Sequence, residues 1–200
     1  MDFIFMLTHN DATVPNALEV MADLKGTGLT HVGFKDIGAT PEQQRQLADL
    51  ARNAGMTVYL EVVSTSVESE LESVAAGIAA GVDWILGGTN PSKALPLLAG
   101  SKVRYAPFPG RVVGHPSVLE GSIPEIAEHA AQLTAMDGVS GLDLLAYRHG
   151  EADPLELTKA VVAAADGPVI AAGSVVSKAQ IVGLAQAGAQ AFTIGGAIFD

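Results

Sequence analysis

The feature that most constrains this chain is an alternation of short apolar runs with longer amphipathic segments. Glycines mark the alternation, because each of seven ends a helix-like segment or a linker shortly before an apolar run: Gly28, Gly55, Gly81, Gly100, Gly138, Gly167 and Gly188. A glycine just past a helix can adopt the left-handed conformation that ends it. The pattern predicts repeated strand–helix units whose strands run parallel.

Eight apolar runs have the length of strands, at residues 3–8, 31–35, 57–63, 84–88, 103–108, 141–147, 168–173 and 191–196. The segments between them repeat apolar residues at helical spacing, and several begin with a proline, as helix starts prefer. Eight units with short loops predict one α/β domain over residues 1–200, folded as a (β/α)8 TIM barrel. A doubly wound open sheet is the alternative, although no early strand ends in a G-x-G-x-x-G turn.

The chain ends at Asp200, just past the eighth predicted strand, so the eighth helix of such a barrel is absent from the given chain. Two explanations stay open at this point. Either the natural chain continues, or another chain closes the last groove, as it would in a homodimer.

Composition excludes several classes of function. The chain has 22 acidic and 11 basic residues, a formal charge of −11, and this disfavours nucleic acids and anionic membranes as partners. Cysteine is absent, which excludes disulfides and thiolate metal sites and fits a cytoplasmic protein. No uncharged apolar run reaches membrane-spanning length, and no signal peptide is visible. We therefore expect a cytoplasmic protein with no membrane or nucleic-acid partner.

Four charged residues interrupt the predicted strands, and nearby prolines leave the facing of one of them, Arg104, open. Alternate residues of a strand face opposite sides. In residues 57–63 the aliphatic side suits the helices, which places Glu61 inside the barrel, and the same reasoning places Lys35 and Asp143 inside. Catalytic groups of this fold come from the carboxyl ends of its strands. We predict Lys35, Glu61 and Asp143 as catalytic residues, with a structural ion pair as the alternative.

Glycine-rich turns close the last two strands. Gly173-Ser174 follows the seventh and Gly195-Gly196 follows the eighth, and these positions allow backbone amides to approach a ligand. A short helix starting at Gly196 would direct its amino end at the same place, where its amides and dipole favour an anion. Loops after the last two strands often bind phosphate in this fold. Plain tight turns are the alternative reading.

With the motifs at residues 171–174 and 194–197, the chain resembles the ribulose-phosphate-binding barrels, which include the histidine-biosynthesis isomerase and cyclase, tryptophan-pathway barrels, and related epimerases and aldolases. The resemblance implies a phosphorylated ligand. It also implies a second phosphate site at Gly87, Gly88 and Thr89, which echo Gly195-Gly196 half a barrel away. Packing inherited from a duplicated half-barrel is the alternative for that pair.

The resemblance has departures. The histidine-pathway enzymes place a catalytic aspartate at the end of the first strand, whereas the acid here, Asp11, is displaced along the chain. The metal ligands of the ribulose-phosphate epimerases are not reproduced, and no other ligand spacing is present. The lysine that closes the second strand, Lys35, is similar to one in the archaeal furan-phosphate synthase, where it is thought to form a Schiff base.

Other candidates lie in loops. Residues 107–122 form a long loop that is rich in proline and glycine, and its Arg111 and His115 could bind substrate over the barrel mouth or could form a structural cover. Arg148 follows the sixth predicted strand and could bind an anion. Tyr147, beside it, could donate a proton.

These observations predict an enzyme, of lyase or aldolase type, acting on a phosphorylated carbonyl compound. Lys35 would stabilise an enolate as an ammonium ion, or form an imine if burial lowered its pKa. Glu61 and Asp143 would be the acid/base pair. We expect no metal and no organic cofactor. The alternatives are a sugar-phosphate isomerase or epimerase of the histidine-biosynthesis type and a non-catalytic ligand-binding barrel.

Overall fold

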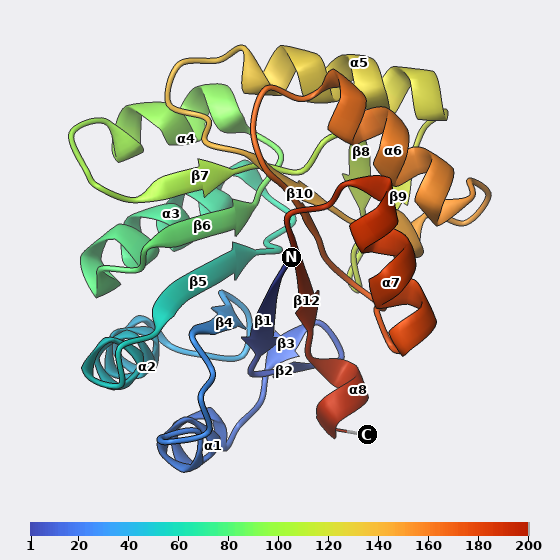
Figure 1. Ribbon diagram of the computed structural model, residues 1–200. Helices are drawn as coiled ribbons and strands as arrows, with labels where there is room; N and C mark the ends of the chain where they lie inside the picture. Colours follow the sequence, from blue (N-terminus) through green and yellow to red (C-terminus); the bar gives the residue numbers. More distant parts are fainter. Residues whose placement is uncertain (200) are drawn as a thin grey trace.

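Eight parallel strands form the wall of a barrel in the computed structural model, which describes residues 1–199 (Figure 1). Around the sheet they are β10 (Leu142–Leu144), β11 (Val169–Ala171), β12 (Ala191–Ile194), β1 (Asp2–Met6), β4 (His31–Lys35), β5 (Thr57–Val62), β6 (Trp84–Gly87) and β7 (Arg104–Ala106). Two hydrogen bonds close the gap between β7 and β10, from Ser140 N to Tyr105 O at 2.7 Å and from Asp143 N to Pro107 O at 3.1 Å. The predicted (β/α)8 fold is confirmed.

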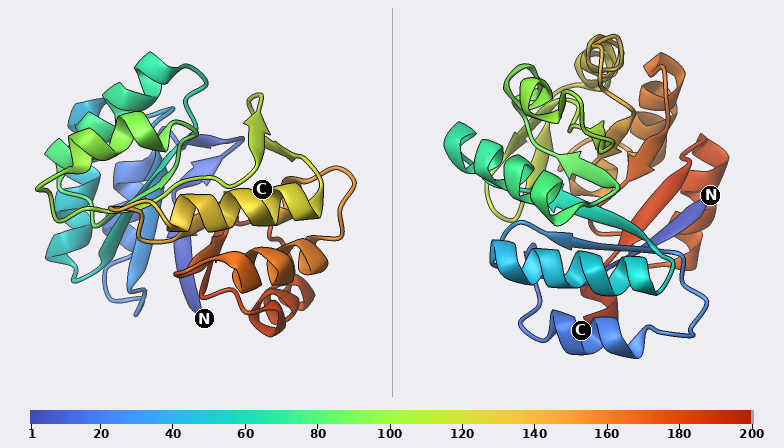
Figure 2. Two further views of the ribbon diagram at one scale, coloured as in Figure 1. Left: turned by 90° about the horizontal axis from the view of Figure 1, so that it is seen from above. Right: turned by 90° about the vertical axis from the view of Figure 1, so that its left-hand side faces the viewer.

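Helices pack outside the strands (Figure 2). They are α1 (Ala17–Asp23), α2 (Pro41–Asn53), α3 (Val67–Ala80), α4 (Pro91–Leu98), α5 (Ile123–Thr134), α6 (Pro154–Ala164), α7 (Lys178–Ala187) and the four-residue α8 (Gly196–Phe199). The side chains of Thr40, Ser122 and Ser177 accept hydrogen bonds from amides three residues on and so cap α2, α5 and α7. Gly81 and Gly188 end α3 and α7 in the left-handed conformation, as the glycine pattern predicts.

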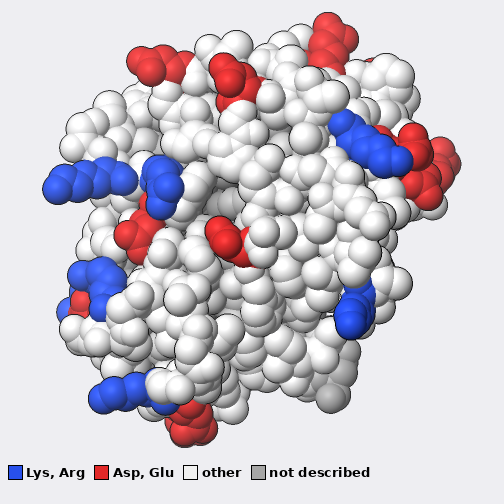
Figure 3. Space-filling model, viewed as in Figure 1, with Lys and Arg blue, Asp and Glu red and all other residues white. Residues whose placement is uncertain are grey.

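The outer surface carries charged side chains in small groups. On the face drawn in Figure 3, the Lys and Arg side chains of the described residues are spread around the edge, and most have acidic side chains nearby. None of the helices within residues 1–199 combines the length and the apolar composition needed to cross a bilayer.

The interior of the barrel contains an apolar layer with a polar layer beside it. The apolar layer consists of Ile4, Met6, Tyr59, Trp84, Leu86, Ala106, Ile170 and Ala191. Lys35 and Glu61 are register partners across β4 and β5, at the carboxyl ends of these strands. Both side chains are buried, as the alternation in the sequence predicts for residues that face inward. The barrel therefore places a lysine and a glutamate side by side where this fold carries its active sites.

Two hairpins lie at the carboxyl end of the barrel. They are formed by β2 (Thr8–His9) with β3 (Ala12–Thr13), and by β8 (Arg111–Val113) with β9 (Val118–Glu120). The first has a two-residue loop in which Asn10 and Asp11 both have positive φ, 48° and 63°. Asn and Asp tolerate this conformation, which a type I′ hairpin turn requires at both positions. The turn returns the chain sharply after β1 and brings Asp11 to the barrel mouth.

Candidate active site

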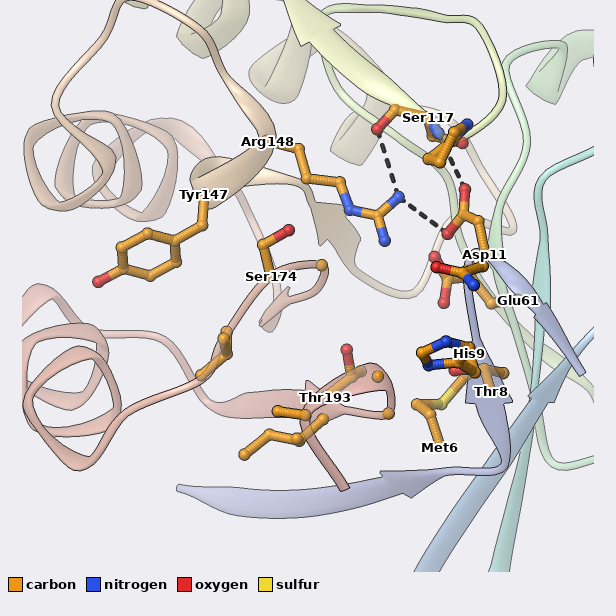
Figure 4. A pocket seen from close by; sticks show the side chains of 18 of the residues that line it. Met6, Thr8, His9, Asp11, Glu61, Ser117, Tyr147, Arg148, Ser174 and Thr193 are labelled. Atoms are coloured by element: carbon orange, nitrogen blue, oxygen red, sulfur yellow. Dashed lines mark hydrogen bonds and ion pairs between the residues drawn. The ribbon is translucent and has the colours of Figure 1, made fainter. Parts of the chain in front are cut away.

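A cavity of about 430 Å³ opens at the carboxyl ends of the barrel strands (Figure 4). Eight of the candidate residues named from the sequence line it: Lys35, Glu61, Tyr147, Arg148, Gly173, Ser174, Gly195 and Gly196. Asp11, which the sequence analysis identified as a displaced acid, lines it as well, together with Ser117. The cavity thus brings the predicted lysine and the two glycine-rich loops to one place.

Lys35 is buried beside the cavity with carboxylates on two sides. Its Nζ donates a hydrogen bond to Asp11 Oδ1 and lies 3.1 Å from Glu61 Oε1. Glu61 lies opposite Lys35 in the register of β4 and β5, and Asp11 lies in the turn of the β2–β3 hairpin. One ammonium and two carboxylates therefore share a site from which bulk water is largely excluded.

Asp11 connects the parts of this site. Its Oδ1 also accepts a hydrogen bond from Arg148 Nη1 at 2.8 Å, and its Oδ2 accepts one from Ser117 N at 2.9 Å. Figure 4 shows Arg148 reaching toward Asp11 and Ser117 across the cavity. His115 lies close by, with its Nδ1 3.9 Å from Asp11 Oδ2. A single carboxylate thus joins β4, both hairpins and the 3-10 turn η1 (Ala146–Arg148).

The electrostatics of the cluster decide the charge of Lys35. Burial alone would raise the pKa of Asp11, but the charges of Lys35 and Arg148 hold that pKa well below its usual range. Burial alone would lower the pKa of Lys35, but Glu61 and Asp11 outweigh it and raise the pKa above that of an ordinary lysine. Lys35 is therefore an ammonium ion at neutral pH. This favours an electrostatic role over an imine, which needs the neutral amine.

Asp143 lies in a different environment from Asp11. Its side chain is fully buried on β10, and neither carboxyl oxygen has a hydrogen-bond partner among residues 1–199. Burial, and then the negative charge of Glu61, raise the pKa of Asp143 well above its usual range. A carboxyl group whose pKa is raised keeps its proton to higher pH and can serve as an acid. The pKa values of Asp143 and Asp11 are thus shifted in opposite directions.

Replacing Asp11 by asparagine keeps the size of the side chain and removes the charge that holds Lys35 and Arg148. We expect the free energy of unfolding at neutral pH to fall by about 3 kcal/mol, because breaking a buried ion pair leaves charged groups unpartnered. The folded pKa of Asp11 lies below the unfolded value of about 3.9, so the stabilisation is complete above that pH and diminishes as the pH falls below it. Chemical denaturation at several pH values measures both effects.

The control for this variant is Asp23→Asn, which removes an exposed carboxylate at the end of α1. It should change stability little at any pH. A stability difference between the wild type and Asp11→Asn that stayed constant into strong acid would contradict the assignment of Asp11 as the ionised centre of the cluster.

The predicted anion-binding loops form another side of the cavity. α8 begins at Gly196, as the sequence predicts. Ile198 N donates to Gly195 O at 2.8 Å, which leaves the amides of Gly196 and Ala197 as the candidates for contact with a ligand. A Cβ atom added at Gly196 would meet only His9 Nδ1, at 4.0 Å, so the space beside this glycine is open. Ser174, which also lines the cavity, has a φ of 57° in the left-handed region. These backbone positions are accessible to a ligand in the cavity.

Arg148 adds a positive charge to the same region. A Cβ atom at Gly173 would lie 2.5 Å from Arg148 Nε, so Gly173 leaves the space in which the guanidinium rests. Only Nη1 of Arg148 donates hydrogen bonds within residues 1–199, to Asp11 and, at 3.3 Å, to Ser117 O. The Nε and Nη2 groups remain available as a pair of parallel donors, which suits a carboxylate or a phosphate.

Gly195 has a packing role that distinguishes it from Gly196. A Cβ atom at Gly195 would lie 2.2 Å from Thr8 Oγ1 and 2.8 Å from Thr8 O, so the glycine allows close approach of the chain after β12 to the chain after β1. We expect Gly195→Ala to destabilise the protein by about 1–3 kcal/mol, because backbone must shift, and Gly196→Ala to have a much smaller effect. Thermal unfolding of the two variants measures this. Equal losses would contradict the assigned roles.

The second predicted phosphate site lies away from this cavity, and a side chain of the protein itself occupies it. Gly88 and Thr89 line a separate cavity of about 270 Å³, and Gly87 precedes them at the end of β6. The amides of Thr89 and Asn90 donate to the carboxylate of Glu70, at 3.1 and 2.9 Å. The structure therefore corrects the expectation of a free anion site here, because a buried side chain of α3 uses the donors.

The two predicted contacts from the long loop differ from each other. Arg111 lies on β8 with its side chain 72% exposed and forms an ion pair with Glu120 on β9. It is not among the cavity-lining residues of the described chain, because its side chain is held along the outside of the hairpin. His115 lies nearer the site, through its proximity to Asp11, with its side chain partly exposed. The predicted substrate contact of Arg111 is not supported by this arrangement.

The sequence around Asp11 indicates a tight turn, which the alternation of residues within the strands does not reveal. Asn10-Asp11 follows β2 directly, and such a pair tolerates the positive φ values of a tight hairpin turn. Ser117 contributes a backbone amide, which no side-chain pattern reveals. Both positions depend on hairpins that close over the barrel.

Comparison with known proteins relates the chain to other barrels. No protein-family model and no curated protein matches the sequence. Among solved structures, similar ones include the N-acetylmannosamine-6-phosphate 2-epimerase from Clostridium perfringens, at a TM-score of 0.71 and 12% identity, with 98% of this chain and 87% of the other covered. The HpcH/HpaI aldolase from Desulfitobacterium hafniense DCB-2 has a TM-score of 0.67 at 14% identity, with 97% and 86% covered.

The citrate synthase SbnG is similar as well, with a TM-score of 0.67, 11% identity, and 98% of this chain and 87% of the other covered. At these identities the likeness establishes the fold alone. The names of these neighbours include an epimerase and an aldolase. They do not single out the histidine-biosynthesis enzymes.

Proposed function

We propose that this chain is an enzyme of aldolase or lyase type, which forms an enolate next to the carbonyl group of a phosphorylated, sugar-like substrate. One observation carries the proposal: the buried ammonium of Lys35, held between Asp11 and Glu61, borders a cavity whose other walls include two glycine-rich loops. The names of two structural neighbours, an epimerase of a sugar phosphate and an aldolase, support the choice.

The chemistry follows from the charge states. The substrate carbonyl oxygen lies beside Lys35 Nζ, where the fixed ammonium stabilises the negative charge of an enolate. In the cleavage direction, Glu61 removes the proton of the substrate hydroxyl, the adjacent carbon–carbon bond breaks, and its electron pair forms the enolate. A proton then returns to the enolate carbon. The two carboxyl groups deliver this proton. Asp143, whose pKa is raised by burial and by Glu61, is its source.

Binding energy comes from the phosphate of the substrate. The Nε and Nη2 donors of Arg148 and the backbone at Ser174 and Gly196 lie around one cavity, and together they hold a dianion. Anchoring the phosphate fixes the carbonyl group at Lys35, which converts binding into correct orientation.

An isomerase or epimerase is the second candidate, because it would use the same enolate. The observation that favours it is the contrast between Glu61, paired with Lys35, and Asp143, whose pKa is raised by burial and by Glu61. Two carboxyl groups in such different environments can remove a proton and return one without cleaving a carbon–carbon bond. Product analysis separates the two reactions.

Deuterium exchange from D2O tests the proposal without knowledge of the natural product. Dihydroxyacetone phosphate, ribulose 5-phosphate and N-acetylmannosamine 6-phosphate are incubated with the protein, and loss of the proton beside the carbonyl is followed by NMR. We expect exchange into at least one phosphorylated compound, and none into its unphosphorylated counterpart. Lys35→Met should abolish the exchange, whereas Lys25→Met, at an exposed lysine, should not. Equal exchange in wild type and Lys35→Met would contradict the proposal.

A further inference from the structure

Resting on the proposed function, we infer that Glu70 limits the protein to substrates with one phosphate, by filling the position that a second anion would take at the end of β6. The uncharged end of the substrate then lies toward the separate cavity of about 270 Å³. Three observations support this inference: the bonds of Glu70, an unpartnered hydroxyl beside it, and the composition of the cavity wall.

Glu70 is held as a bound anion would be held. It is 1% exposed, and its carboxylate accepts hydrogen bonds from Thr89 N at 3.1 Å, Asn90 N at 2.9 Å and Asn90 Nδ2 at 2.8 Å. These donors belong to the N-terminal end of α4, where the helix dipole favours negative charge. The internal carboxylate thus satisfies the amides and the dipole together.

The surroundings of Gly88 show how closely the carboxylate fits. A Cβ atom at this position, whose φ is +77°, would lie 2.7 Å from Glu70 Oε1 and 3.2 Å from Tyr105 Oη. Tyr105 is completely buried, and its hydroxyl has no hydrogen-bond partner within residues 1–199. Burial, and then the charge of Glu70, raise the pKa of Tyr105, so the hydroxyl keeps its proton. The unpartnered hydroxyl of Tyr105 therefore lies near the negative charge of the Glu70 carboxylate.

The adjoining cavity is lined mainly by uncharged side chains. Its apolar members are Val62, Val63, Phe108, Val112 and Val113. Ser117 lines this cavity and the one beside Lys35, so the two lie next to each other beneath the β8–β9 hairpin. With the anion donors already used by Glu70, such a wall suits the uncharged end of a substrate better than a second phosphate.

Phosphate stoichiometry provides the test. Inorganic phosphate is titrated calorimetrically into the wild type, Glu70→Ala and Glu70→Ser, and crystals soaked in phosphate locate each bound ion. Glu70→Ser leaves a small hydroxyl for the amides in case the alanine variant folds poorly. Glu72→Gln, at an exposed position of the same helix, is the control for the change in charge. We expect one phosphate in the wild type and the control, and two in the Glu70 variants.

The outcomes separate this inference from the proposed function. A phosphate at Thr89 and Asn90 in the wild type would overturn the inference, and so would folded Glu70 variants that gain no ion there. If the wild type binds no phosphate beside Arg148, the proposed function fails. A phosphate gained at Thr89 in the Glu70 variants would support the role of Glu70 even then.

Discussion

Replacing Lys35 by methionine is expected to lower the free energy of unfolding by about 3–5 kcal/mol, because Asp11 and Glu61 would remain buried without their shared cation. The same change should reduce turnover by about 10²-fold or more, since the fixed charge that faces the enolate is lost. Chemical denaturation and steady-state assays on the substrate found by deuterium exchange measure the two effects separately.

The pH dependence of this variant identifies the cause. Acid protonates the stranded carboxylates, so the stability deficit of Lys35→Met should shrink as the pH falls toward the usual carboxyl pKa of about 4. The double variant Lys35→Met/Asp11→Asn should recover part of the stability, but not the activity. A single variant with wild-type stability would show that the ion pairs contribute nothing, and wild-type turnover would exclude Lys35 from the reaction.

Replacing Asp143 by asparagine should lower turnover while preserving the fold. We expect turnover to fall by about 10²-fold or more, because the amide cannot give up a proton to Glu61 or to the substrate. The fold should be preserved, since the raised pKa favours the neutral form of the buried acid and the amide has nearly the same shape. Wild-type turnover in this variant would remove Asp143 from the mechanism.

Stability against pH provides a second measurement on Asp143→Asn. The folded pKa of Asp143 is raised above its unfolded value of about 3.9, so the wild type loses stability as the pH rises from that value through the folded pKa. The asparagine variant lacks this loss and should become progressively more stable than the wild type over the same range. A variant that became less stable than the wild type at higher pH would show that the native carboxyl group is ionised and stabilised by its surroundings.

Strand alternation was sufficient to place the charged residues inside the barrel. Lys35, Glu61 and Asp143 each interrupt an apolar strand whose alternate residues suit the helix layer, so only one orientation buries the aliphatic side. Short-range patterns also indicated the helix that starts at Gly196. These features depend on neighbours close in the sequence, which is why the sequence alone could predict them.

Features made by distant contacts were not predictable in the same way. Glu70 shares a face of α3 with the buried Val74 and Gly77, but no local pattern reveals that its carboxylate accepts hydrogen bonds from the amides of Thr89 and Asn90 beyond the end of β6. β10 ends at Leu144 and a 3-10 turn follows, so the alternation that would place Leu145 inside the barrel stops, and this residue packs in the outer core. In both cases tertiary packing decides what the side chain contacts.

The central claim is that residue 35 is an ammonium ion held by Asp11 and Glu61, and its ionisation can be observed directly. In protein labelled with ¹⁵N and ¹³C at lysine, the signal that disappears in Lys35→Met is followed by NMR as the pH is raised from neutral. The account predicts that this nitrogen stays protonated beyond about pH 10.4, where ordinary lysines lose their proton. A neutral amine at neutral pH would contradict it.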